Sequence, residues 1–318
     1  MEYRTLGRAG VKVSTLCLGC MNFGRPTDEC ESVRVIHQAL DAGINFLDTA
    51  NVYNDGISEQ IVGKALQGHR DKVVLATKVH GRMGDGPNDR GNSRYHIMQQ
   101  VEASLRRLQT DHIDLYQLHR PDPHTPIDEQ LGALDDLVHQ GKVRYIGTST
   151  FPAWQLCEAL WVSERHGFER FVCEQPPYNL LSRGIEAEVL PFCAAHGFAV
   201  IPWSPLAGGW LSGKYRKGQS LPEDSRGSRR GWDLEAPRNQ KRLDAIEKLA
   251  ALVNELGCTF SQFGLAWTLA NPAVTAPIIG PRTVDQLEDN LGALDVELPD
   301  VVLEQIDGIV PPETNLFP

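Results

Sequence analysis

The 318-residue sequence has no excess of positive charge, no long apolar run and no second CxxC motif to accompany its single one. Its 31 Lys and Arg residues are outnumbered by 41 Asp and Glu, so the formal net charge at pH 7 is -10. A general nucleic-acid-binding protein needs a basic face, and this balance argues against that class. It does not exclude an anionic ligand, but any phosphate would need a local cationic pocket.

No apolar run approaches the roughly 18 residues that a membrane-spanning helix requires, and no charged-then-apolar leader follows Met1. The seven cysteines are scattered, and the CxxC pattern from Cys17 to Cys20 has no second pair or His cluster near it. Zinc is therefore not expected, and buried thiols are. We expect a cytoplasmic protein with no metal, no membrane partner and no nucleic-acid partner.

Apolar, strand-like runs alternate with amphipathic helical patterns along most of the chain. The runs cover residues 16–19, 44–49, 73–78, 113–119, 143–149, 171–176, 199–204 and 276–280. Helical patterns cover residues 28–41, 58–66, 95–108, 127–139, 152–166, 184–196, 239–256 and 259–270. This alternation predicts right-handed βαβ units and parallel strands. Eight runs favour an α/β fold of the closed (β/α)8 TIM-barrel type. An open doubly wound sheet stays possible, but no GxGxxG turn follows any run.

The remaining segments are expected to lie at the two ends of the barrel. Residues 3–14 predict a short N-terminal β-hairpin that caps or plugs one end. Residues 213–238, rich in Gly, Ser, Arg and Pro, predict a long loop over the C-terminal face. The Gly-rich residues 80–88 should shape a substrate pocket there. Because no segment resembles a linker, residues 1–318 are predicted to form one barrel domain.

Four polar residues lie at or just beyond the ends of successive predicted strands: Asp48 with Tyr53 beyond it, Lys78, and His119. Each also has a simpler structural interpretation. Asp48 could cap a turn and Tyr53 could cover the edge of the core. Lys78 could be a solvated strand end and His119 a capped turn residue. Together they are harder to dismiss, because a barrel brings the C-terminal ends of its strands around one mouth.

The chemistry of these four side chains suits proton transfer to a carbonyl group. A free Tyr has a pKa of about 10, and the ammonium of Lys78 would lower the pKa of Tyr53. Asp48 would keep Lys78 charged, while His119 would orient the carbonyl and share the proton transfer. Such a group polarises an aldehyde or ketone oxygen while hydride arrives at the carbon.

The sequence resembles the aldo-keto reductases from Thr5 to at least Gly292. The motifs that carry the resemblance are GINFLDTA at 43–50 with Tyr53, Gly56 and Glu59, Thr77-Lys78, IDLY at 113–116, HRPD at 119–122, VRYIGTS at 143–149, Gln175 with YNLL at 178–181, WSPL at 203–206 with Gly213-Lys214, and IIG at 278–280 with QLEDN at 286–290. The long loops make the chain similar to the bacterial and channel-β-subunit branch. The resemblance implies a (β/α)8 barrel that binds NADPH across its C-terminal mouth and reduces a small-molecule carbonyl substrate.

The resemblance also implies residue roles. The family's catalytic tetrad maps onto Asp48, Tyr53, Lys78 and His119, with Tyr53 as the general acid. Ser149 and Gln175 match groups that bind the nicotinamide amide, and Trp203 matches the aromatic ring that stacks on the nicotinamide. The full set of implied cofactor positions is Cys20, Met21, Asp48, Ser149, Thr150, Gln175, Trp203, Ser204, Pro205, Leu206, Ala207, Gly208, Lys214, Arg226, Gly280, Arg282, Gln286, Asp289 and Asn290.

The preference for NADPH over NADH depends on Arg282. The pattern Thr283-x-x-Gln286 predicts a capped helix start, and a helix N-terminus beside an Arg can bind an anion. Arg226, Arg229 and Arg230 are either a solvated loop face or part of a clasp over the 2′-phosphate.

A second hypothesis is an NADPH-binding regulatory protein with little turnover, because channel β subunits share the fold and these cofactor positions. His119 argues for an enzyme, since the channel relatives typically lack His there. A metal-dependent sugar isomerase is not expected, because Lys78 would repel a cation among the few carboxylates available. Both a monomer and a homo-oligomer fit the sequence.

Overall fold

Eight parallel strands form the centre of the computed structural model, which describes residues 1–317. They are β3 (Cys17–Gly19), β4 (Phe46–Asp48), β5 (Val74–Val79), β6 (Ile113–Leu118), β7 (Val143–Ser149), β8 (Cys173–Gln175), β9 (Ala199–Val200) and β10 (Ile278–Ile279). Their order is β10-β3-β4-β5-β6-β7-β8-β9. The ring closes because Thr275 donates its N–H to the Val200 carbonyl at 2.8 Å and Ile278 donates to Pro202 at 2.8 Å. The predicted (β/α)8 barrel is confirmed.

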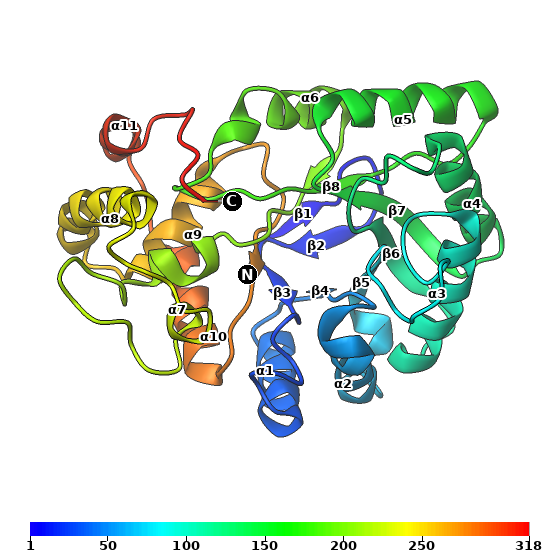
Figure 1. Cartoon of the computed structure of the whole chain (residues 1–318), viewed down its shortest axis with the longest axis horizontal. Helices are drawn as coiled ribbons and strands as arrows, with labels where there is room; N and C mark the ends of the chain where they lie inside the picture. Colours follow the sequence, from blue (N-terminus) through cyan, green and yellow to red (C-terminus); the bar gives the residue numbers. More distant parts are fainter. Residues whose placement is uncertain (318) are drawn as a thin grey trace.

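Helices surround the strands on the outside of the ring (Figure 1). They are α1 (Glu29–Asp41), α2 (Ile57–Ala65), α3 (Arg94–Leu108), α4 (Ile127–His139), α5 (Ala153–His166), α6 (Val189–His196), α7 (Arg226–Arg229), α8 (Pro237–Leu256), α9 (Phe260–Ala270), α10 (Val284–Leu291) and α11 (Asp300–Ile309). Helices α8 and α11 pack against each other at one side of the ring. Among residues 1–317, no helix has both the length and the apolar character that crossing a membrane requires.

The structure differs from the predicted helices in three places. The pattern over 184–196 divides into a 3-10 helix, Gly184–Glu186, and α6, because Pro191 lacks an N–H and is accommodated only in the first turn of an α-helix. The 213–238 segment is irregular as predicted, except for the single turn of α7 and its last two residues, which begin α8. The sequence did not predict α11.

The N-terminal hairpin, β1 (Tyr3–Thr5) and β2 (Lys12–Ser14), plugs the barrel. Leu6, Ala9 and Val13 are buried against the inward-facing side chains of the strands. The apolar residues of this inner core are Leu6, Ala9, Val13, Cys17, Phe46, Val74, Ala76, Leu115, Cys173, Ala199, Ile201, Ala276 and Ile278. The plug enters where β8 and β9 begin, so the opposite end, where the strands finish, is left open for a site.

The hairpin turn predicts a stability effect at Gly7, which has φ +56°. A Cβ there would lie 2.5 Å from the Val172 carbonyl oxygen and 2.6 Å from the Ala199 nitrogen. Gly7→Ala should therefore lower the free energy of unfolding by about 1–3 kcal/mol or more, measured by urea denaturation. The matched control is Gly10→Ala in the same turn, where an added Cβ would meet nothing within 4 Å. Equal unfolding midpoints for the two variants would contradict this account of the plug.

Candidate active site

The site is built by the two-residue repeat of the strands. On β4, Phe46 faces the inner core and Asp48, two residues later, faces the open end of the barrel. Lys78, Gln117 and Gln175 likewise follow core residues of β5, β6 and β8 by two positions. All four of these polar side chains are buried. The interior of the barrel is therefore apolar around the strand centres and polar in the layer next to the open, C-terminal end.

Lys78 lies at the centre of this polar layer and is fully buried. Its Nζ donates to Asp48 Oδ2 at 2.6 Å, to the Thr49 carbonyl at 2.8 Å and to the Tyr53 hydroxyl at 3.2 Å. An ammonium has three donors, so each of its protons has an acceptor. The structure thus brings together Asp48, Tyr53 and Lys78, as the sequence predicted.

The second oxygen of Asp48 is also occupied. Oδ1 accepts hydrogen bonds from Gln117 Nε2 at 3.1 Å and from Gln175 Nε2 at 3.0 Å, and the two amides bond each other at 3.2 Å. These bonds fix the carboxylate in the orientation that meets Lys78. Gln117 had no assigned role in the sequence, and its position in the inward-facing set of β6 is the signal that could have found it.

Tyr53 reaches Lys78 from a strained turn, not from a strand. It is the first residue of a 3-10 helix, Tyr53–Gly56, in which Asn54 and Asp55 have φ of 49° and 56°. The Asn54 amide donates to the Phe23 carbonyl at 2.7 Å and to the Arg25 carbonyl at 3.1 Å. Positive φ at two successive non-glycine residues costs free energy, and such strain is concentrated at functional sites. The anchored turn holds the phenol over the barrel mouth.

Burial and the Lys78 ammonium act on the Tyr53 pKa in opposite directions. Burial has the larger effect, so the pKa of Tyr53 is raised above its ordinary value despite Lys78. Lys78 does lower the Tyr53 pKa as predicted, but burial, which the sequence does not show, outweighs this effect. For Lys78, burial lowers the pKa, but Asp48 and Tyr53 more than offset it, so the pKa is raised. Tyr53 is a protonated phenol beside a charged ammonium.

His119 stands beside this pair at the end of β6. Its ring lies edge-on to Tyr53, with 5.6 Å between centroids and 83° between planes. Burial, with Lys78 and Arg120 adding to it, lowers the pKa of His119 to about 2. The imidazole is therefore neutral at physiological pH and can donate one hydrogen bond to a carbonyl oxygen. This charge state suits the predicted orienting role of His119.

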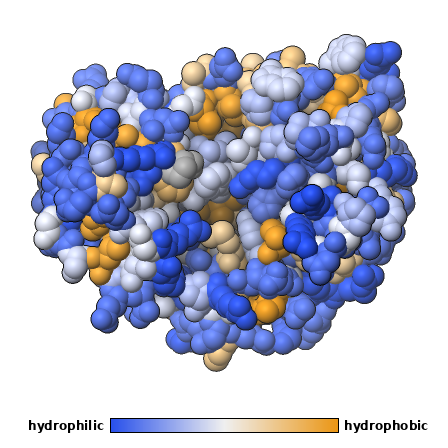
Figure 2. Space-filling model, in the orientation of Figure 1, coloured by the Kyte–Doolittle hydropathy of each residue, from blue (hydrophilic) through white to orange (hydrophobic). Residues whose placement is uncertain are grey.

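A cavity of about 800 Å³ opens above these residues. Figure 2 shows the corresponding hollow near the centre of the face that Figure 1 presents. The predicted site residues that line the cavity are Met21, Asp48, Tyr53, His119, Gln175, Trp203, Ser204, Pro205, Leu206, Gly208, Lys214, Arg226, Gly280, Arg282, Gln286, Asp289 and Asn290. Cys20, Lys78, Ser149, Thr150 and Ala207 lie behind this lining. Ser149 donates to the Gln175 carbonyl at 2.9 Å, and Cys20 is fully buried. Direct cofactor contacts of Cys20, Ser149, Thr150 and Ala207 stay a prediction.

The loop after β9 approaches the cavity with its backbone. Ser204 and Ala207 have φ of 53° and 48°, and Gly208 and Gly209 also have positive φ. Asn179 holds the segment by donating from Nδ2 to the Ser204 carbonyl at 3.0 Å. As at Tyr53, the strained backbone lies where the cavity begins.

One end of the cavity is lined by a cation cluster, consisting of Lys214, Arg226, Arg229, Arg230 and Arg282. Among residues 1–317, no member of the cation cluster has a carboxylate oxygen within 4.0 Å. Burial lowers the pKa of Lys214, and the charges of Arg282, Arg226 and Arg229 lower it further. Mutual repulsion without a counter-ion favours binding of an anion here.

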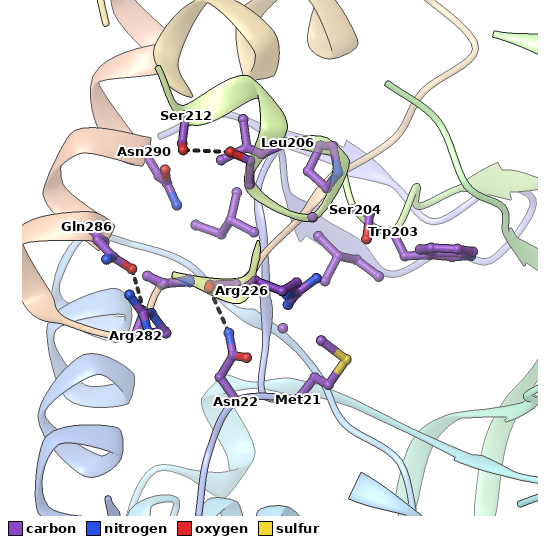
Figure 3. A pocket seen from close by; sticks show the side chains of 18 of the residues that line it. Met21, Asn22, Trp203, Ser204, Leu206, Ser212, Arg226, Arg282, Gln286 and Asn290 are labelled. Carbon is purple, nitrogen blue, oxygen red and sulfur yellow. Dashed lines mark hydrogen bonds between the residues drawn. The ribbon is translucent and has the colours of Figure 1, made fainter. Parts of the chain in front are cut away.

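The start of α10 differs from the expected anion site. Glu31 accepts from the Val284 N–H at 3.1 Å, and Thr283 accepts from the Gln286 N–H at 3.3 Å. Gln286 accepts from the Arg282 N–H at 2.9 Å, so the expected capping box is only half formed. The Val284 and Gln286 amides already have side-chain partners, so an anion would bind mainly the side chains of the cation cluster. In Figure 3, Arg282, Gln286 and Asn290 lie at the opposite side of the cavity from Trp203.

Several lining residues had no site role assigned from the sequence, among them Arg120 and Phe317, and one expected loop is absent from the lining. Arg120 and Phe317 line the cavity, and the Phe317 ring lies 6.4 Å from that of Trp203. Arg120 was visible in the HRPD motif, whereas Phe317 belongs to a tail without periodicity. No residue of 80–88 lines the cavity, so the expectation for that loop is wrong. The loop bonds to itself instead, with Arg82 Nε donating to the Gly84 carbonyl at 2.8 Å.

Sequence similarity relates the chain to a known protein family. The sequence model of the Aldo/keto reductase family matches residues 15–311. An uncharacterized oxidoreductase of Bacillus subtilis, YrpG, is 48% identical over 98% of this chain and 96% of its own length. A probable voltage-gated potassium channel subunit beta of Arabidopsis thaliana is 38% identical over 98% of this chain and 97% of its own. Versiconal hemiacetal acetate reductase of Aspergillus parasiticus is 36% identical over 94% of each chain.

The low pKa of His119 predicts a pH effect on stability. The unfolded imidazole, with a pKa near 6.5, binds a proton that the folded one excludes down to about pH 2, so stability falls as pH drops below about 6.5. Between pH 8 and pH 5 the wild type should lose about 2 kcal/mol more than His119→Asn. Urea denaturation of both proteins at the two pH values measures this difference, with pH 8 as the reference. The same loss in both would show that His119 is protonated in the fold.

Proposed function

Because the chain belongs to the Aldo/keto reductase family, we propose that it reduces an aldehyde or ketone to an alcohol with NADPH, and catalyses the reverse oxidation with NADP⁺. One contact carries this proposal: the Tyr53 hydroxyl accepts a hydrogen bond from the fully buried Lys78 ammonium at 3.2 Å, at the edge of the cavity. A protonated phenol positioned by a permanent cation is a proton donor whose conjugate base is stabilised in place.

The residues of the cavity fit NADPH. The cation cluster offers Arg and Lys donors for phosphates, and Trp203 offers a flat aromatic surface for the nicotinamide. A volume of about 800 Å³ falls within the range of small-molecule and cofactor sites. Lys214, Arg226 and Arg282 would hold the phosphates. When bound, NADPH supplies the hydride that reduces the carbonyl carbon.

The chain itself supplies the proton. Tyr53 donates its hydroxyl proton to the carbonyl oxygen, and the ammonium of Lys78 stabilises the phenolate that remains. Asp48 keeps Lys78 charged, which its 2.6 Å contact with Nζ favours. His119, neutral in this site, donates a hydrogen bond that orients the carbonyl oxygen. In the reverse direction the phenolate of Tyr53 accepts the proton of the alcohol.

An NADPH-binding regulatory protein with little turnover is the second candidate. The 38% identical relative from Arabidopsis, named as a probable channel β subunit, supports it. His119 favours the enzyme, because a site that only binds cofactor has no need of a carbonyl-orienting group. A panel of small aldehydes, ketones, sugars and ring ketones, with NADPH oxidation followed by absorbance, separates the two.

We also propose a cytoplasmic location. All seven cysteines have free thiols, and Cys17 and Cys20 are buried as predicted. Free thiols in this number suit a reducing compartment.

The role of Tyr53 predicts that Tyr53→Phe removes the proton donor without changing the shape of the cavity. We expect kcat to fall about 10²–10⁴-fold, while NADPH still quenches Trp fluorescence with an unchanged dissociation constant. Loss of cofactor binding in this variant would show that Tyr53 acts in binding instead.

The role of Arg282 predicts that Arg282→Ala weakens NADPH far more than NADH, by about tenfold or more, because a charge-assisted bond to the 2′-phosphate is lost. Arg165→Ala on α5 is the control, since Arg165 is exposed and stacks on Trp161 away from the cavity. Dissociation constants for both cofactors come from fluorescence titration. Equal losses for the two cofactors would place the 2′-phosphate elsewhere.

A further inference from the structure

Arg120 is a cation at the reacting end of the cavity. It follows His119 directly and lines the cavity with it. Among the lining residues that the structure describes, it is the one Lys or Arg outside the cation cluster. It leaves the end of β6, whereas the cation cluster comes from the loop after β9 and from the start of α10. The charge of Arg120 therefore has a different position and needs a different explanation.

The contacts of Arg120 satisfy only part of its guanidinium. Nη1 donates to the His119 carbonyl at 2.7 Å, to Ser149 Oγ at 3.3 Å and to Thr150 Oγ1 at 3.2 Å. Within residues 1–317, Nε and Nη2 have no hydrogen-bond acceptor, and no carboxylate oxygen lies within 4.0 Å of the group. The guanidinium carbon lies 5.7 Å from the centre of the Trp203 ring. All of these partners are neutral.

The nearby carboxyl groups do not balance this charge. Asp48 is already paired with Lys78 and bonded to Gln117 and Gln175. Glu174 is fully buried behind the lining, where it accepts from the Phe151 N–H at 3.1 Å. A partly buried cation without a counter-ion is unfavourable, and an anionic ligand removes that cost.

We propose that Arg120 binds a carboxylate on the substrate, so that the preferred substrates are aldehydes or ketones that carry a carboxylate group. This rests on the proposed reductase function. A guanidinium with two unused donors on one edge matches the two oxygens of a carboxylate. Phosphate binding sites collect several cations, as the cation cluster does, whereas Arg120 stands alone. Its place beside His119 and Trp203 would set the carboxylate close to the carbonyl that is reduced.

The test compares two probes that differ only in charge, 4-carboxybenzaldehyde and its methyl ester, with NADPH as reductant. The wild type should reduce the carboxylate with a kcat/KM about tenfold or more above that of the ester. In Arg120→Gln, which keeps a neutral donor for the oxygens that Nη1 now contacts, the ratio should fall to about one, chiefly through KM. Taking the ratio within one variant cancels any general damage to the site.

Two further variants separate charge from structure. Arg120→Lys should restore part of the ratio, while Arg282→Gln should raise the KM for NADPH and leave the ratio unchanged.

A wild-type ratio near one, or an equal loss for both probes in Arg120→Gln, would overturn the proposal. Arg120 would then only stabilise the loop that carries Ser149. If neither probe is reduced, the reductase proposal is contradicted, and calorimetric binding of the two probes decides the question for Arg120. If wild type and Arg120→Gln then bind the carboxylate probe with equal affinity, the proposed role of Arg120 is rejected.

Discussion

A lysine inside a barrel is stable only if its charge is compensated on every side. Lys78 meets this condition, because its three protons reach a carboxylate, a backbone carbonyl and a phenol. The carboxylate of Asp48 is in turn held by Gln117 and Gln175. Removing one partner would leave a buried group unsatisfied, so the layer must be present as a whole. The position of Tyr53 follows from this requirement, since its hydroxyl is the third acceptor.

The sequence predicted much of this layer, for a physical reason. Strands buried on both faces are nearly continuous apolar runs, and the polar residue that ends each run is visible. Asp48, Lys78 and His119 were found in that way. The helix predicted over 259–270 is present as well, and its start is fixed by a capping box of Thr259 and Gln262. Residues 184–196 show the limit, because the helical pattern covered all of them, whereas α6 begins only at Val189, two residues before Pro191.

What the sequence could not give depends on contacts between distant segments. The two amides on Asp48 come from β6 and β8, and only the barrel places them together. The Tyr53 pKa depends on depth of burial, which no neighbour in the sequence reports. Phe317 lines the cavity because the tail bonds to Leu181, with the Phe317 N–H donating to its carbonyl at 2.9 Å. None of these features has a periodic or compositional signal.

The cations of the cavity divide into two kinds, and the division follows from how far each is satisfied. Lys78 has no free donor and no exposed surface, so it can act on a ligand only through Tyr53. The cation cluster and Arg120 have cavity-facing charge without a carboxylate partner among residues 1–317, so they can bind a ligand directly. Lys78, whose charge is satisfied, therefore controls proton transfer through Tyr53, whereas the cation cluster and Arg120, whose charges are not, select the ligands that bind in the cavity. The overall charge of -10 strengthens this contrast, because a net negative charge repels anions at long range.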